Sequence, residues 1–164
     1  MRVFFQLGTA ISLAWIAVPA AAQTSDPNLK TCEEKSGDEA IAGCTAAITS
    51  GKLSTADLAI TFYNRGIEWS NKHDYAHAIT DYTEAIRLNP QLAQAFNNRG
   101  IAYDNLNDYA RAIADYSEAI RLNPKYALAL YGRGLAKAGL GQSAGSKADM
   151  ARALAIDPHI AQRF

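Results

Sequence analysis

The chain has 164 residues, of which 49% are hydrophobic and 20% are charged. This balance is typical of an ordinary globular domain and excludes a disordered, highly charged chain. Lysine plus arginine and aspartate plus glutamate both total 16, so the formal net charge is zero. A neutral chain has no general electrostatic attraction to phosphate backbones, and we therefore expect no nucleic-acid partner.

Residues 1–22 have the three parts of a secretory signal peptide. A positive start at Arg2 precedes an apolar stretch that runs to Val18, and Pro19 and three alanines follow it. The apolar stretch is too short to span a bilayer, and the small residues suit cleavage after about Ala22. We predict a periplasmic or secreted protein with no membrane span in its mature form. The alternative is a retained N-terminal anchor helix.

Cys32 and Cys44 are the only two cysteines of the chain. Because an exported protein enters an oxidising compartment, we predict a disulfide between them. Closing a loop of about a dozen residues in this way contributes roughly 3 kcal/mol to stability. The alternative is two free thiols. A zinc site is disfavoured, because no histidine lies near either cysteine in the sequence.

A repeat of 34 residues decides the fold. Its units span residues 59–92, 93–126 and 127–160, and the first two units are identical at 21 of 34 positions. The heptapeptide Glu84–Pro90, for example, returns unchanged at 118–124. The third unit is degenerate, but it keeps an Arg-Gly pair, an aspartate, an alanine and a proline in the same positions.

Each unit contains two amphipathic segments. In the first unit, small or aromatic residues recur at i, i+4 and i+7 from Phe62 and again from Ala78. This spacing predicts two helices, each with one buried face. Asp74 and Asp108 follow a turn and are placed to cap the second helix of their units. A proline near the end of each unit stops that helix, so we expect the units to be helical hairpins.

This pattern resembles the tetratricopeptide repeat (TPR) family, whose helix-turn-helix unit carries a large residue, glycine, an aromatic, alanine, an aromatic, alanine and proline in order. The matching residues are Phe62, Gly66, Trp69, Ala78, Tyr82, Ala85 and Pro90, and then Phe96, Gly100, Tyr103, Ala112, Tyr116, Ala119 and Pro124. The resemblance implies an all-α fold, a right-handed α-solenoid of about three units, occupying residues 54–164. The third unit is expected to be the C-terminal cap, because Lys147 replaces an isoleucine on the face that a further unit would cover.

Residues 23–53 are predicted to be an N-terminal capping segment that contains both cysteines. The stretch from Asp38 to Ile48 resembles the second half of a repeat, with Cys44 in the position of Tyr82. We expect one capping helix here, with the stretch around Cys32 held to it by the disulfide. A cysteine-bearing entry helix before Asn-Arg-Gly repeats is similar to exported TPR proteins of Gram-negative bacteria.

The resemblance also implies a binding groove, because the first helices of TPR units line a concave wall. The family's groove positions fall on Tyr63, Asn64, Ile67, Asn97, Asn98, Ile101, Asn105 and Tyr131, with Ile60, Ser70, Gln94, Leu128 and Leu135 beside them. Amides that bond a peptide backbone and tyrosines that supply contact area suit a protein or peptide ligand. The alternative is an open face that is merely solvated. Chaperone tails are disfavoured, since the Lys and Asn that clamp their carboxylate are replaced by Tyr63 and Ile67.

A charged pair recurs once per unit, and its two members are sixteen residues apart in the sequence. The pairs are Arg65 with Asp81, Arg99 with Asp115, and Arg133 with Asp149. Such a ladder either reads a ligand or joins helices within the fold. Repetition in step with the fold favours ion pairs that join helices, but the sequence leaves both interpretations open.

No motif for catalysis or for a cofactor occurs in the sequence. His73 and His77 have the spacing of metal ligands on a helix, but His73 falls in a predicted turn and no third ligand follows, so we expect no metal. The sequence therefore predicts a scaffold that binds other proteins and not an enzyme. The alternatives are a self-associating structural component of an envelope assembly and, less favoured, an enzyme subunit. The partner, the pathway and the oligomeric state stay open.

Overall fold

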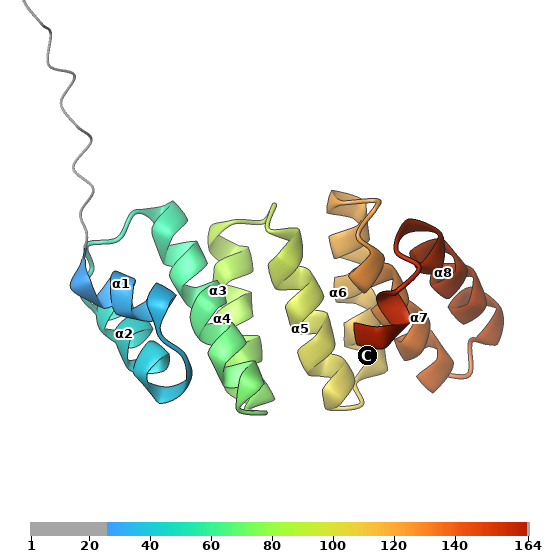
Figure 1. Ribbon diagram of the computed structural model, residues 1–164, viewed down its shortest axis with the longest axis horizontal. Coiled ribbons are helices and arrows are strands. Elements are labelled where there is room, and N and C mark those ends of the chain that lie inside the picture. Colours follow the sequence, from blue (N-terminus) through green and yellow to red (C-terminus); the bar gives the residue numbers. More distant parts are fainter. Residues whose placement is uncertain (1–25, 164) are drawn as a thin grey trace, which may run out of the picture.

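The computed structural model describes residues 26–163, which form an α-solenoid of stacked helical hairpins (Figure 1). The helices are α1 (Pro27–Glu34), α2 (Gly37–Thr49), α3 (Thr55–Asn71), α4 (Tyr75–Leu88), α5 (Ala93–Asn105), α6 (Tyr109–Leu122), α7 (Ala127–Gly139) and α8 (Ser143–Ile156), followed by the short 3₁₀ helix η1 (Ile160–Arg163). This part of the chain contains no strand, and the predicted all-α solenoid is confirmed. The proposed signal peptide, residues 1–22, lies outside the described residues.

Side-chain caps and left-handed turn residues set the ends of the helices. The side chains of Asp74 and Asp108 accept hydrogen bonds from first-turn N–H groups of α4 and α6, as the sequence predicts, and Ser54 does the same for α3. His73 and Asn107 directly precede the two aspartates with φ of 59°. This left-handed conformation lets the chain reverse within a few residues, so that the two helices of a unit pack side by side.

A glycine and a tyrosine fit together at the centre of the first two repeats. A Cβ atom at Gly66 would lie 2.7 Å from the ring of Tyr82, and one at Gly100 would lie 3.0 Å from the ring of Tyr116. Both tyrosines are buried, with an exposed fraction of 1%. Only glycine lets the first helix approach the ring this closely. In the third repeat Met150 takes the position of the tyrosine.

The first helices of the hairpins lie on the inner side of the stack. α1 contacts α3, α3 contacts α5 and α5 contacts α7, whereas within residues 26–163 no contact joins α2 to α4, α4 to α6 or α6 to α8. Because successive first helices approach each other more closely than successive second helices, the stack curves with the first helices on its concave side. At the other end, η1 packs on α7 and α8 with Ile160 fully buried, while Lys147 is exposed on α8.

The N-terminal segment forms two helices, α1 and α2, where the sequence predicts a single capping helix. Asp26 caps α1 and Pro27 begins it, which are ordinary start signals for a helix. Cys32 on α1 is bonded to Cys44 on α2, and both cysteines are buried. This disulfide-linked hairpin packs against α3 and extends the inner wall by one helix.

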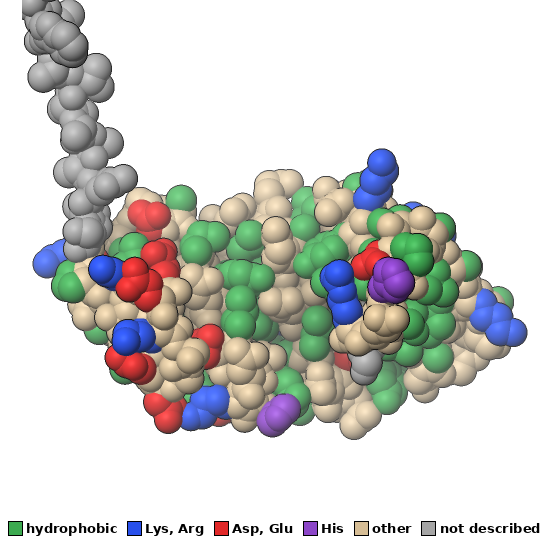
Figure 2. Space-filling model, viewed as in Figure 1, with side chains coloured by type: hydrophobic (Ala, Val, Ile, Leu, Met, Phe, Trp, Pro, Cys, Tyr) green, Lys and Arg blue, Asp and Glu red, His purple; other side chains and the backbone are tan. Residues whose placement is uncertain are grey.

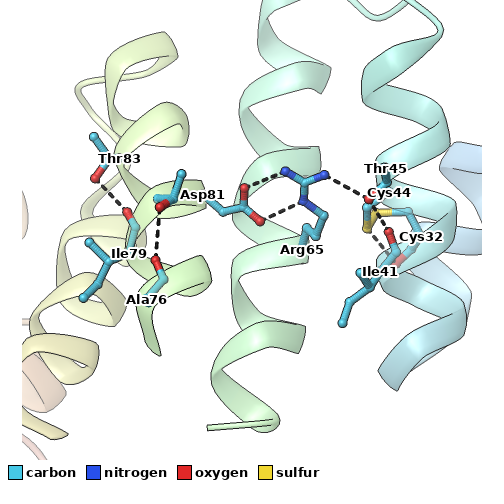
Figure 3. A network of polar contacts seen from close by, with 10 residues as sticks. Cys32, Ile41, Cys44, Thr45, Arg65, Ala76, Ile79, Asp81 and Thr83 are labelled. Carbon is cyan, nitrogen blue, oxygen red and sulfur yellow. Dashed lines mark hydrogen bonds and ion pairs between the residues drawn. A yellow bond between two sulfur atoms is a disulfide. The ribbon is translucent and has the colours of Figure 1, made fainter. Parts of the chain in front are cut away.

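One arginine in each repeat joins three helices (Figure 3). Arg65 on α3 donates two hydrogen bonds to the carboxylate of Asp81 on α4, at 2.8 and 2.7 Å, and a third to the hydroxyl of Thr45 on α2, at 2.9 Å. Thr45 donates in turn to the backbone carbonyl of Ile41. The same contacts recur between Arg99, Asp115 and Thr83, and between Arg133, Asp149 and Ser117.

The aspartates of this ladder are buried, which supports its structural interpretation. Asp81, Asp115 and Asp149 are all among the buried residues of the fold, so a ligand has little access to their carboxylates. Asp149 also accepts a hydrogen bond from Lys137 at 2.7 Å. Burial acts to raise the pKa of Asp149, but the hydrogen bonds from Arg133 and Lys137 outweigh it, and the pKa is lowered.

Candidate functional site

The concave surface of α3, α5 and α7, which we call the inner groove, contains two adjoining hollows. The first has a volume of about 200 Å³ and is lined by Ile67, Ser70, Asn71, Tyr82, Asn98 and Ile101. The second, of about 170 Å³, lies between α1 and α3 and is lined by Cys32, Glu33, Lys35, Asn64, Ile67 and Glu68. Ile67 belongs to both hollows. Four of the predicted groove residues, Asn64, Ile67, Asn98 and Ile101, line these hollows.

Hydrogen bonds connect the polar side chains between α3 and α5. The Asn98 amide donates to the Tyr63 hydroxyl at 3.3 Å, and the Asn97 amide donates to the Asn98 carbonyl oxygen at 3.0 Å. The Tyr63 ring lies 6.0 Å from the ring of Tyr82. Burial raises the pKa of both tyrosines, so their hydroxyls stay protonated at neutral pH. These groups offer a neutral set of donors and acceptors for a ligand.

Three other predicted groove residues differ in how far they are exposed to solvent. Asn97 is only 2% exposed, and its Oδ1 atom has no hydrogen-bond partner in the described chain. It stands where the longer Tyr63 stands in the preceding repeat, so its short side chain stays below the surface. Asn105 is exposed at the end of α5, where it accepts a hydrogen bond from the Tyr75 hydroxyl of α4. Tyr131 is half-buried on α7.

In the second repeat Asp104, and not the predicted Asn105, corresponds to Ser70, which lines the first hollow. It lies 34 residues after Ser70, which places it between α5 and α7 as Ser70 is placed between α3 and α5. The predicted residue, Asn105, is one position further on and corresponds to Asn71. Burial raises the pKa of the Asp104 carboxyl, and its Oδ1 atom is buried without a partner among the described residues. Asp104 could have been identified from the sequence by adding 34 residues to Ser70.

The cations of the three inner helices are all engaged in ion pairs. α3, α5 and α7 contain Arg65, Arg99, Arg133 and Lys137 as their cationic residues. Each of them pairs with a buried aspartate of a second helix. On the face of the molecule in Figure 2, charged side chains gather over the N-terminal hairpin and at the C-terminal end, whereas the middle is largely apolar or uncharged. α3, α5 and α7 thus offer no free positive charge to an acidic ligand, and Lys35, which lines the second hollow, lies 3.6 Å from Glu39.

Neither a metal site nor a membrane span is found in the part of the chain that the structure describes. Residues 26–163 contain no group of three His, Cys, Asp or Glu side chains placed to hold a metal ion. His73 contacts the Tyr75 hydroxyl at 2.9 Å and His77 contacts the Asp74 carboxylate at 2.7 Å, so the two histidines have different partners. No helix in the same range is long and apolar enough to cross a bilayer.

Comparison with known proteins identifies the repeat. A model of the tetratricopeptide repeat matches residues 93–126, and a second TPR repeat model matches residues 71–107. No curated protein sequence gives a significant match. Among solved structures, the first TPR of Spaghetti (RPAP3) bound to the HSP90 peptide SRMEEVD is 30% identical to this chain, with a TM-score of 0.60. That match covers 61% of this chain and 79% of the RPAP3 chain.

Two further structures extend the comparison. The second TPR domain of human RPAP3, in complex with the HSP70 peptide SGPTIEEVD, is 30% identical with a TM-score of 0.62, and the match covers 64% of this chain and 88% of that one. MamA is 26% identical with a TM-score of 0.67, and the match covers 76% of this chain and 70% of that one. Repeat length, hairpin geometry and sequence matches agree, and the chain belongs to the tetratricopeptide repeat family.

Proposed function

We propose that this chain is a protein-interaction module that binds a peptide segment of another protein in the inner groove. The observation that carries the proposal is the pair of adjoining hollows, where Ile67 and Ile101 lie beside the amides of Asn64 and Asn98. Apolar contact area next to groups that both donate and accept suits the backbone and side chains of a peptide. The two RPAP3 domains that resemble this chain are bound to peptides, which supports a ligand of the same kind here.

The proposed ligand differs in charge from those peptides. Both RPAP3 ligands end in Glu-Glu-Val-Asp, and an acidic end of this kind needs cationic receptors. Here the cations of α3, α5 and α7 are already held by buried aspartates. Tyr63 and Ile67 occupy positions where chaperone-binding repeats carry clamp residues. An acidic tail therefore has no charged receptor on these helices.

A peptide selection tests the use of the groove. A random-peptide library on phage is selected against the mature chain and against two variants. Ile67→Arg places a long cationic side chain at the boundary of both hollows, and Thr80→Arg places the same side chain on the exposed surface of α4. We expect the wild type and Thr80→Arg to enrich shared sequences and Ile67→Arg to lose them. Equal enrichment by Ile67→Arg, or none by the wild type, contradicts the proposal.

The mature protein is proposed to act in the periplasm or after secretion. Residues 1–22 have the composition of a cleaved signal, and the bond between Cys32 and Cys44 suits an oxidising compartment. A fusion of residues 1–25 to alkaline phosphatase, which is active only after export, tests this location. Phosphatase activity in intact cells is the expected result, and an inactive cytoplasmic fusion contradicts it.

Self-association is the second candidate function. α8 exposes Leu154 and Ile156 at the end of the stack, and exposed aliphatic side chains on a terminal repeat favour contact with another molecule. Light scattering over a concentration series tests this candidate. A mass that rises with concentration, and that returns to the monomer value in Leu154→Lys, supports it; a monomer at all concentrations contradicts it.

A further inference from the structure

The described residues contain three buried polar side-chain atoms that lack a hydrogen-bond partner, and all three belong to the second repeat. They are Asn97 Oδ1 and Asp104 Oδ1 on α5 and the Tyr116 hydroxyl on α6. Buried polar atoms in folded proteins are nearly always paired, so each exception requires an explanation. All three atoms are able to accept a hydrogen bond. The Asn97 and Asp104 oxygens only accept, whereas the Tyr116 hydroxyl accepts or donates, so the two atoms on α5 lack a donor.

In the first repeat, side chains of the protein itself surround Tyr82, the counterpart of Tyr116. There Ser70, Tyr82 and Asn98 line the same hollow, and the Asn98 amide donates to the Tyr63 hydroxyl beside it. In the second repeat, 34 residues on, the counterpart of Asn98 is Gly132 and the counterpart of Ser70 is Asp104. Gly132 has no side chain, so the second repeat has no counterpart of the Asn98 amide.

Tyr116 is held in place even though its hydroxyl is unpaired. A Cβ atom at Gly132 would lie 2.7 Å from Tyr116 Cζ and 3.0 Å from its hydroxyl oxygen, so the ring tip lies directly against α7. Burial and, next, the charge of Asp104 raise the pKa of Tyr116. The Tyr116 hydroxyl is therefore neutral at physiological pH.

Asp104 carries a charge that nothing in the described chain neutralises. None of the ion pairs among residues 26–163 includes it, whereas Asp81, Asp115 and Asp149 each hold an arginine. Its raised pKa is the effect expected when a carboxylate loses water and gains no cation. A single carboxylate is also a poor metal site, because divalent cations require several ligands. The missing group is a cationic donor.

We propose that the peptide bound in the inner groove presents a lysine or arginine, whose side chain enters between α5 and α7, pairs with Asp104 and donates to the Tyr116 hydroxyl. This inference rests on the proposed function and adds the chemistry of the ligand. Ammonium and guanidinium groups carry several N–H donors and no acceptor, which suits a carboxylate and a hydroxyl that both lack a partner. The cations of the inner helices are bound to buried aspartates and leave the site free of competing charge. Charge-assisted hydrogen bonds of this kind are strong and specific.

The test compares Asp104→Asn with Glu118→Gln in the same random-peptide selection. Each change removes one negative charge and keeps the shape of the side chain, but Glu118 pairs only with its exposed neighbour Arg121. The wild type and Glu118→Gln are expected to enrich peptides with Lys or Arg at a shared position. Asp104→Asn is expected to bind the enriched peptide about tenfold more weakly, which corresponds to about 1.4 kcal/mol. Replacing the peptide's cation by glutamine should weaken the wild type by the same factor and Asp104→Asn hardly at all.

The outcomes separate this inference from the proposed function. Enriched peptides without Lys or Arg, or equal affinity of Asp104→Asn and the wild type, overturn the role of Asp104 and leave peptide binding in the groove intact. A wild type that enriches no peptide overturns both. Charge reversal gives a second readout: Asp104→Lys should enrich acidic peptides, and continued enrichment of cationic ones contradicts the inference.

Discussion

Truncating Asp115 to alanine should destabilise the fold by about 3 kcal/mol. Asp115 is 6% exposed and accepts two hydrogen bonds from Arg99, at 2.7 and 2.8 Å. Its loss leaves the guanidinium with one remaining hydrogen bond, to Thr83. Removing one partner of a buried ion pair costs about 3–5 kcal/mol. The Arg99 side chain is 17% exposed, so water reaches part of it, and the lower end of that range applies.

Urea unfolding followed by circular dichroism measures this loss with the disulfide intact. For an m-value of about 2 kcal/mol/M, a loss of 3 kcal/mol moves the midpoint by about 1.5 M without a change in slope. Arg99→Ala should cost a similar amount, and the double variant should cost less than the sum of the two, because the residues share one interaction.

An exposed pair provides the control. Glu118 and Arg121 have side chains that are 45% and 61% exposed, so Glu118→Ala should change stability by no more than about 0.5 kcal/mol. A loss below about 1 kcal/mol for Asp115→Ala would refute the view that the ladder joins the helices. Unchanged stability combined with altered peptide selection would show instead that the ladder reads a ligand.

Three further predictions concern packing, the disulfide and pH. Gly66→Ala puts a Cβ 2.7 Å from the buried Tyr82 ring and should cost about 1–3 kcal/mol in thermal unfolding; an unchanged melting temperature contradicts the close approach. Reducing the bond between Cys32 and Cys44 should lower stability by roughly 3 kcal/mol and speed amide exchange in α1 more than in α5, and uniform exchange contradicts this. The pKa of Asp149 is lowered from 3.8, so its contribution is present above that pH and is lost as pH falls through the lowered value. The stability gap between wild type and Asp149→Asn should therefore narrow in acid, as measured by urea unfolding at each pH, and a gap that widens contradicts the assignment.

The hairpins were predictable because their signals are local. The contact of Gly66 with Tyr82 follows from residue types at fixed positions in a 34-residue unit, and the caps at Asp74 and Asp108 follow from their place before a helical pattern. The spacing of Arg65 and Asp81 favoured an ion pair between them, and the structure shows that pair. Each of these features depends on residues of the same unit or of the next one, and their spacing can be read from the repeat.

Features that depend on less regular surroundings were harder to predict. α1 has one buried residue, Cys32, so its sequence shows no helical periodicity of apolar residues. Asn97 has a groove position by its spacing, yet it is buried, which the spacing does not reveal. The role proposed for Asp104 follows only from comparing it with Ser70 and from comparing Gly132 with Asn98. The signal peptide and the cellular location stay predictions.

An NMR titration tests the central claim most directly. The peptide enriched by the wild type is added to ¹⁵N-labelled mature protein, and amide shifts are followed along the chain. Binding in the inner groove predicts that the largest shifts fall on α3, α5 and α7 and on the side-chain amides of Asn64 and Asn98. Shifts confined to the second helices, α4, α6 and α8, would contradict the account.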